Sequence, residues 1–184
     1  VENIKAYIAL SEAQKMAHVR MGFPEEKIHV LHHYLDDEGE ESSIAPVDGD
    51  VLFIGRLTEE KGLDLLIRSW ACVDSKGRKL RIVVKGEMLG DLEKLVSEEN
   101  IQDVIFEGFV PKEKHSELWR KASFSVAPSL WNEPFGMVVL EAWQRGRPVL
   151  ATNLGSFPEL IANGADGWLA AANVKDFSAV MQRA

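Results

Sequence analysis

The sequence contains a single cysteine, Cys72, and this scarcity excludes several kinds of protein. One thiol can form neither a disulfide framework within the chain nor a cysteine-based metal site. Cys72 falls inside the helical pattern GLDLLIRSWACV. We therefore expect a buried apolar thiol with a packing role.

Basic residues are also fewer than acidic ones. The chain has 21 Lys and Arg against 29 Asp and Glu, a net charge of −8. That balance argues against a nucleic-acid partner and disfavours tight binding to anionic lipid. No run of about 18 apolar residues and no signal peptide is present, so no membrane-spanning helix is predicted. Because the sequence stops inside the helical pattern VKDFSAVMQRA, we expect a fragment of something longer.

Several sequence motifs of nucleotide-binding proteins and hydrolases are absent as well. The chain has no Gly-x-Gly-x-x-Gly after its first strand, no Gly-Lys-Ser/Thr and no Gly-x-Ser-x-Gly, which weakens dinucleotide, P-loop and hydrolase interpretations. The acidic stretch DGD, 48–50, precedes a strand and would lie at the wrong edge of the sheet for a ligand. His32 and His33 are adjacent, and neighbouring side chains on a strand point to opposite sides. We expect no metal site.

The chain does carry an alternation of short apolar runs and amphipathic segments, and 46% of its 184 residues are apolar. This pattern predicts an α/β fold, a doubly wound parallel sheet covered by helices on both faces. The predicted strands span 51–55, 80–86, 103–108, 123–128, 147–152 and 167–171, and the predicted helices 61–73, 89–99, 112–121, 135–145 and 156–162.

The N-terminal part repeats the strand, helix, strand pattern at 4–10, 11–22 and 27–33, with Ser11 as the expected N-cap. A polar, acidic stretch with Gly and Pro follows. We predict that residues 1–35 close a preceding unit, that 36–50 form a linker, and that 51–184 form the main domain.

Ligands of an open parallel sheet gather at the carboxyl ends of the strands, so the loops there are the candidates. The first is GRLTEEKG, 55–62, in which Gly55 permits close approach of a ligand to the backbone. Arg56 and Lys61 offer the pair of cations that suits a diphosphate. The alternative is a solvated turn with Thr58 as N-cap.

The second candidate is APSLWNEPFGMVVLEAW, 127–143. A helix is expected to begin near Pro134, a favoured residue in the first turn. The amide groups of Phe135, Gly136 and Met137 would then be free to bind an anion or a hydroxyl group.

Two acidic residues accompany this helix. We expect Glu133 to project into the cleft, and Glu141, eight positions later, to reach another part of one elongated ligand. The alternative is that Glu133 only complements the helix dipole and Glu141 lies at a surface edge. Trp143 is expected to pack in the core, whereas for Trp131 core packing and sugar stacking both stay open.

The third candidate is ATNLGSFPELI, 151–161. Ser156 and Glu159 have the spacing of a capping box at the start of a helix. That structural role accounts for both residues, and the functional alternative is that the loop after Gly155 walls a phosphate or sugar pocket.

These stretches, with VIFEGFVP and GADGWLAA, resemble a known family. The chain is similar over 47–184 to the C-terminal, donor-binding domain of retaining glycosyltransferases with two Rossmann-like domains (GT-B type), in the glycogen-synthase-like and mannosyltransferase-like group. Residues 1–35 look like the closing segment of the acceptor domain. The most specific element is the pair of acids Glu133 and Glu141. The chain departs from the family in two places: it has Gly155-Ser156 where the family often has Gly-Gly, and VLHHYLDD in place of the usual Pro-Asn-Gly before the linker.

The resemblance implies catalytic roles for Arg56, Lys61 and Glu133. The two cations would hold the donor diphosphate, Glu133 would contact sugar hydroxyls, and Glu141 would accept hydrogen bonds from the ribose. The further donor-binding positions that it implies are Gly55, Phe109, Val110, Phe135, Gly136 and Met137, of which Phe109 and Val110 would touch the base through the main chain.

The activity implied is a metal-independent transfer from a UDP-, GDP- or ADP-sugar to a carbohydrate, lipid-linked or other acceptor, with no cofactor. The resemblance further implies a cytoplasmic protein, with peripheral association at the inner membrane face as an option for the full-length chain. Two alternatives stay open: a sugar-nucleotide epimerase and a non-catalytic sugar-nucleotide binding module.

Overall fold

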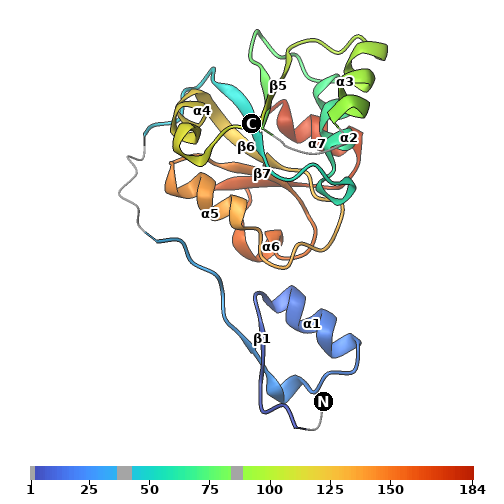
Figure 1. The fold of residues 1–184 in the computed structure, drawn as a ribbon, viewed down its shortest axis with the longest axis vertical. Coiled ribbons are helices and arrows are strands. Elements are labelled where there is room, and N and C mark those ends of the chain that lie inside the picture. Colours follow the sequence, from blue (N-terminus) through green and yellow to red (C-terminus); the bar gives the residue numbers. More distant parts are fainter. Residues whose placement is uncertain (1–2, 37–42, 84–88) are drawn as a thin grey trace.

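A computed structural model describes residues 3–36, 43–83 and 89–184, with no description of the Lys112 side chain (Figure 1). A small N-terminal unit consists of the parallel pair β1 (Tyr7–Ala9) and β2 (Ile28–Val30) with α1 (Glu12–Arg20) between them. The main domain follows, built around a second sheet. The predicted boundaries of the linker, 36–50, stay a prediction, because 37–42 lie outside the described residues.

The main sheet has six parallel strands in the order β5-β4-β3-β6-β7-β8. The chain moves outward from β3 to β5, crosses over, and moves outward again from β6 to β8. The predicted α/β, doubly wound, Rossmann-like fold is confirmed, and its switch point lies between β3 and β6. The strands are β3 (Asp50–Ile54), β4 (Leu80–Val83), β5 (Val104–Gly108), β6 (Ala122–Ala127), β7 (Val149–Thr152) and β8 (Gly167–Ala170).

Helices cover both faces of this sheet, because successive side chains of its strands point in opposite directions. Val51 and Phe53 pack in one apolar cluster with α2 (Leu63–Trp70), α3 (Leu89–Glu98) and α7 (Val174–Met181), whereas Leu52 belongs to a second cluster on the other face. That second cluster contains residues of α4 (His115–Lys121), α5 (Met137–Gln144) and α6 (Phe157–Leu160). Short 3-10 turns span Glu25–Lys27, Glu59–Lys61 and Lys112–Lys114.

The prediction for Cys72 was wrong, because its thiol is exposed. Helix α2 ends at Trp70, so Cys72 lies in the turn beyond the apolar face of the helix. Its Sγ donates to the carbonyl oxygen of Arg68 at 3.5 Å. The sequence pattern continued past the last helical residue and made a surface position look internal.

Arg147 is a buried cation that the sequence did not single out; its exposed fraction is 1%. Its Nε donates to the carbonyl of Trp119 at 2.8 Å, and its Nη2 donates to Ser43 Oγ at 2.8 Å. Burial lowers the pKa of this guanidinium. Because Ser43 lies in the predicted linker, its bond with Arg147 ties the linker to the main domain.

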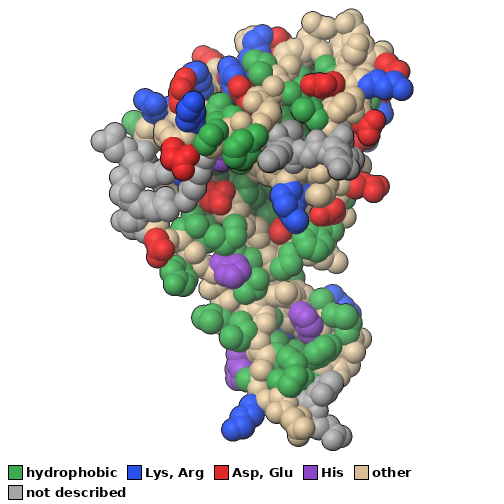
Figure 2. Space-filling model, viewed as in Figure 1, with side chains coloured by type: hydrophobic (Ala, Val, Ile, Leu, Met, Phe, Trp, Pro, Cys, Tyr) green, Lys and Arg blue, Asp and Glu red, His purple; other side chains and the backbone are tan. Residues whose placement is uncertain are grey.

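The N-terminal unit exposes apolar side chains, and Figure 2 shows green and purple groups gathered on it while charged groups lie mainly on the other domain. Surfaces of this kind are common at interfaces between protein units. The exposed apolar residues of the unit and the segment after it include Ile4, Ile8, Met16, Met21, Leu31 and Tyr34.

The capping box predicted for Ser156 and Glu159 does not form. Ser156 Oγ instead donates to the carbonyl of Phe135 at 2.7 Å. Glu159 reaches the N-terminal unit, where its two carboxylate oxygens accept from the amides of Glu12 at 2.8 Å and Ala13 at 2.5 Å. Helix α6 is a single turn, and its acid caps the start of α1 rather than its own helix.

We expect a Glu159→Gln substitution to weaken this contact between the two units. A neutral amide keeps one acceptor oxygen but loses the attraction between a carboxylate and a helix N-terminus, about 1 kcal/mol. The amides of Glu12 and Ala13 should then exchange with deuterium roughly fivefold faster.

The matched control is Glu98→Gln, which also removes one negative charge. Glu98 pairs with Lys94 on the surface of α3, and the two side chains are 64% and 70% exposed. Exchange at the start of α1 should not change in that variant. Unchanged exchange in Glu159→Gln would mean that the carboxylate does not hold the two units together.

Candidate functional site

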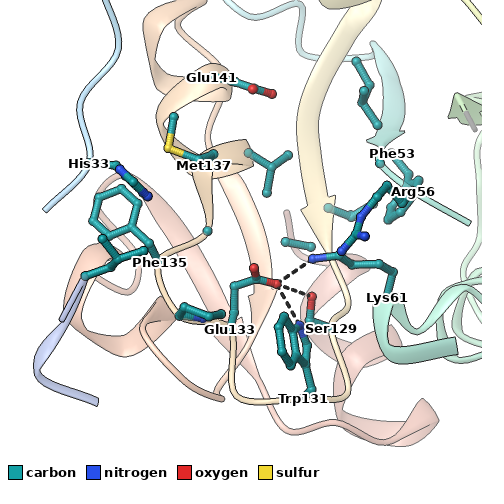
Figure 3. A pocket seen from close by; sticks show the side chains of 18 residues that line it. His33, Phe53, Arg56, Lys61, Ser129, Trp131, Glu133, Phe135, Met137 and Glu141 are labelled. Atoms are coloured by element: carbon teal, nitrogen blue, oxygen red, sulfur yellow. Dashed lines mark hydrogen bonds and ion pairs between the residues drawn. The ribbon is translucent and has the colours of Figure 1, made fainter. Parts of the chain in front are cut away.

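A cavity of about 590 Å³ opens at the carboxyl ends of β3 and β6, at the switch point of the sheet (Figure 3). Loops after both strands and the start of α5 line it, and Leu10 and His33 of the N-terminal part also reach it. The sequence-predicted residues that line this one cavity are Gly55, Arg56, Lys61, Glu133, Phe135, Gly136, Met137 and Glu141.

Lys61 and Glu133 form an ion pair at the cavity wall, with 2.7 Å between Nζ and Oε2. Their side chains are only 19% and 14% exposed. Ser129 Oγ at 3.3 Å and Trp131 Nε1 at 3.0 Å donate to the same carboxylate oxygen. A partly buried acid is thus held by three donors and stays oriented in the absence of a ligand.

Backbone contacts explain how residues far apart in the sequence meet. The amide of Leu130 donates to the carbonyl of Glu60 at 2.8 Å, which joins the loops after β3 and β6. The amide of Ser156 donates to the carbonyl of Glu133 at 3.0 Å, and Thr152 Oγ1 donates to the carbonyl of Ser129 at 2.7 Å. Three loops at the edge of the sheet therefore support one another.

Helix α5 begins at Met137, so the predicted start near Pro134 was wrong. Gly136 is the N-cap and has φ +86°, a left-handed conformation that ends the preceding loop and starts the helix. A Cβ there would lie 2.6 Å from Cε1 of Phe157. The first-turn amides belong to Met137 and Val138, whereas those of Phe135 and Gly136 lie in the loop before the helix.

Arg56 lines the cavity from the side opposite the α5 helix (Figure 3). Its side chain is 74% exposed, and its Nη2 lies 3.9 Å from Glu60 Oε1. An exposed pair at that distance contributes little to stability. The guanidinium is therefore able to turn toward an anion in the cavity.

Glu141 lies on α5 at the far end of the cavity from Glu133 (Figure 3). It also lines an adjoining cavity of about 440 Å³, between α4 and α5, together with His115 and Trp119. The two acids therefore face different parts of one elongated space, as their separation of eight residues predicts.

Phe109 and Val110 do not line the main cavity. The Phe109 side chain is 68% exposed, and the carbonyl oxygen of Val110 lies 2.8 Å from His115 Nε2. Main-chain contact of these two residues with a base stays a prediction.

The histidine pair is arranged differently from the prediction. Strand β2 ends at Val30, so His32 and His33 are not strand residues that point to opposite sides. Both rings lie 5.5 Å from the ring centroid of Phe135. Nothing in the sequence indicates that His33 reaches the cavity, because its approach depends on how the N-terminal unit lies against the loop.

The acidic stretch 48–50 is occupied by structural contacts: Asp50 Oδ2 accepts from Arg81 Nε at 2.5 Å. Within 3–36, 43–83 and 89–184, no three His, Cys, Asp or Glu residues are grouped so that they could hold a metal ion. In the same ranges no helix is long and apolar enough to cross a membrane.

Comparison with protein families gives a match over residues 37–184 to the model described as Glycosyl transferases group 1. The chain belongs to this family. The matched segment contains the whole of the six-stranded main domain.

Curated relatives agree with this assignment to the group 1 glycosyltransferases. An uncharacterised glycosyltransferase of Methanocaldococcus jannaschii is 37% identical over 119 residues, which is 64% of this chain and 30% of that protein. The D-inositol 3-phosphate glycosyltransferase of Streptomyces avermitilis is 36% identical over 130 residues, 64% of this chain and 28% of the relative. The matched segment is thus less than a third of each of these relatives.

Solved structures share the fold of this glycosyltransferase domain. The sucrose-phosphate synthase of Thermosynechococcus elongatus has a TM-score of 0.85 at 24% identity, over 99% of this chain and 49% of that one. Anabaena HepE in complex with UDP and glucose has a TM-score of 0.82 at 22% identity, over 97% of this chain and 53% of that one. The chain spans about half of each of these structures.

Proposed function

We propose that this chain is the donor-binding part of a retaining, metal-independent glycosyltransferase that takes a nucleoside-diphosphate sugar. The single observation that carries the proposal is the gathering of Arg56, Lys61, the first turn of α5 and two acids in one cavity at the switch point. No other described cavity combines cations, helix amides and paired acids in this way.

The diphosphate would lie between the cations and the start of α5. As the bond from the anomeric carbon to the diphosphate breaks, negative charge grows on the leaving oxygen. Lys61, Arg56 and the amides of Met137 and Val138 would stabilise that charge. Cations and amides placed in advance can supply this stabilisation without a divalent ion, which is why we propose metal independence.

The sugar would lie beside Glu133. Lys61, Ser129 and Trp131 all donate to Oε2 of this acid. Among the described residues none donates to Oε1, which is therefore available to accept from sugar hydroxyl groups. The Lys61–Glu133 pair would then connect the sugar to the departing diphosphate and keep both in position.

The ribose and the base would occupy the other end of the space. Glu141 lies there, next to the second cavity between α4 and α5. A carboxylate suits the two hydroxyl groups of a ribose because it accepts two hydrogen bonds. The base would lie nearer Val110, in line with the contact through the main chain that the family resemblance implies.

The acceptor would approach from the side of the N-terminal unit. Leu10 and His33 reach the cavity from that side, next to the Glu133 loop. An acceptor domain preceding residue 36 would complete the site. HepE, a structural neighbour, was solved with UDP and glucose, and TarM of Staphylococcus aureus with UDP and a GlcNAc-glycerol, which supports donors and acceptors of these kinds.

The test uses the full-length protein and UDP-glucose, GDP-mannose and ADP-glucose. One of these should raise the melting temperature, and free nucleoside diphosphate should be released at a substantial rate only when an acceptor is added. Activity should persist in EDTA, and NMR should show that the anomeric configuration of the product equals that of the donor.

Other outcomes identify the alternatives. Binding without release under any acceptor would indicate a non-catalytic binding module, and interconversion of the sugar without an acceptor would indicate an epimerase. Absence of binding by all three donors and their nucleotides would reject the proposal.

A further inference from the structure

Trp131 is an aromatic residue at the cavity that the sequence alone left open between core packing and sugar contact. It lies in the loop between β6 and α5, its exposed fraction is 40%, and it lines the main cavity. It belongs to neither apolar core cluster of the described residues. A half-exposed indole at a cavity wall offers an apolar surface to a ligand.

Trp143, at the other end of the segment 127–143, has a structural role and serves as a comparison. It packs against an apolar cluster, and its Nε1 donates to the carbonyl of Asp166 at 3.0 Å. Trp131 instead donates from Nε1 to Glu133 Oε2, also at 3.0 Å, and its side chain lines the main cavity. The indole N–H of Trp131 therefore binds a side chain of the site, whereas that of Trp143 binds a backbone carbonyl of the fold.

The ring is part of a compact group of side chains (Figure 3). Lys61 Nζ lies 5.7 Å from the centroid of the Trp131 ring and 2.7 Å from Glu133 Oε2. The bond from the indole N–H fixes the edge of the ring beside the carboxylate, so an apolar surface and an acceptor oxygen lie next to each other. Few orientations of the ring keep both the hydrogen bond to Glu133 and the contact with Lys61. The two contacts therefore restrict the motion of the indole.

A hexose has the complementary chemistry. Its C–H bonds form an apolar face, and its hydroxyl groups project from the rim. A flat aromatic surface suits the face, and an adjacent carboxylate suits the hydroxyl groups. A diphosphate or a ribose alone does not need both features at this end of the cavity.

We propose that Trp131 determines specificity for the glycosyl group of the donor: its ring contacts the C–H face of the sugar, and its N–H positions Glu133 for the sugar hydroxyls. This inference rests on the proposed function, because it identifies the part of the donor that Trp131 recognises. It assigns the contribution of Trp131 to the sugar and not to the nucleotide.

The experiment compares two ligands on each variant of the intact protein. Calorimetry gives Kd for a nucleoside diphosphate and for the matching sugar donor, from the pairs UDP and UDP-glucose, GDP and GDP-mannose, and ADP and ADP-glucose. The pair that the wild-type protein binds most tightly is used throughout. The readout is the ratio of the two Kd values, which isolates the contribution of the sugar.

Trp131→Ala should weaken binding of the sugar donor on the order of tenfold and leave Kd for the nucleoside diphosphate within about twofold. Trp131→Phe keeps a ring but loses the N–H, so its donor affinity should fall between those of the wild type and the alanine variant. The control is Leu130→Ala, the preceding residue, whose side chain is 45% exposed and does not line the main cavity. Its ratio should equal that of the wild type.

The outcomes separate this inference from the function on which it rests. If Trp131→Ala weakens both ligands equally, or neither, the residue is structural and the inference is wrong while the proposed function stands. If the wild-type protein binds none of the six ligands, the proposed function fails and this inference fails with it.

Discussion

Replacing Lys61 by alanine should lower kcat/KM of the full-length enzyme by roughly 30- to 150-fold. A unit-charge contact at 4 Å amounts to about 4 kcal/mol at an effective dielectric constant near 20, before the cost of desolvation. A net loss of about 2–3 kcal/mol of transition-state stabilisation gives that range of rates. Steady-state kinetics with the donor identified by thermal shift provides the measurement.

The geometry adds a second reason for a large effect. Lys61 is the cation of a pair whose side chains are 19% and 14% exposed, so its loss leaves Glu133 partly buried beside a negatively charged donor. Repulsion between that acid and the diphosphate should raise KM as well as lower kcat.

The matched control is Lys121→Ala. This lysine also pairs with a glutamate, at 2.9 Å from Glu117, but the two side chains are 52% and 66% exposed and lie on α4. The Lys121→Ala enzyme should have the activity of the wild type. Near-normal turnover in Lys61→Ala would remove Lys61 from the mechanism.

Replacing Gly155 by alanine should lower both stability and donor binding. Gly155 has φ +59°, and a Cβ there would lie 2.3 Å from the amide nitrogen and 2.5 Å from the carbonyl oxygen of Glu133. Left-handed backbone costs an alanine about 1–2 kcal/mol, and the collision with a fixed backbone adds about 1–3 kcal/mol. We expect a loss of about 3–4 kcal/mol in the free energy of unfolding.

For a domain of this size that loss corresponds to a melting temperature lower by roughly 10 °C. Relief of the collision requires the Glu133 loop to move, which disturbs the Lys61 ion pair. Affinity for the sugar donor should therefore fall in the variant protein that remains folded. Thermal unfolding monitored by circular dichroism and calorimetric titration measure the two effects.

Gly164→Ala is the control that separates backbone strain from collision. Gly164 has φ +87°, but nothing lies within 4 Å of a Cβ at that position. This variant should lose only the cost of left-handed backbone, about 1–2 kcal/mol, and bind donor normally. Equal losses in the two variants would show that Gly155 is not in contact with the Glu133 loop.

The sequence was a good guide to the sheet and a poorer guide to the ends of the helices. Strands β3 and β6 begin and end within one residue of the predicted ranges, because continuous apolar runs mark strands buried on both faces. Helix α5 begins two residues later than the predicted 135–145, since Gly136 adopts a left-handed conformation that no hydrophobic period reveals.

Contacts across the chain were beyond what the sequence could predict. The spacing of Ser156 and Glu159 fits a capping box, yet the acid caps α1, whose amides are 146 and 147 positions away. Local spacing cannot distinguish a partner within the same turn from one brought near by folding. Cys72 was misplaced for a similar reason, since only the structure shows where α2 ends.

By itself the sequence determined the α/β architecture and the convergence of Arg56, Lys61 and Glu133, because the carboxyl ends of parallel strands lie at one edge of a sheet. The tertiary structure alone decided which atoms meet: three donors on one oxygen of Glu133, and Trp131 exposed beside it. Hydrophobic pattern sets the order of the elements, whereas hydrogen-bond partners depend on distances of a few tenths of an ångström.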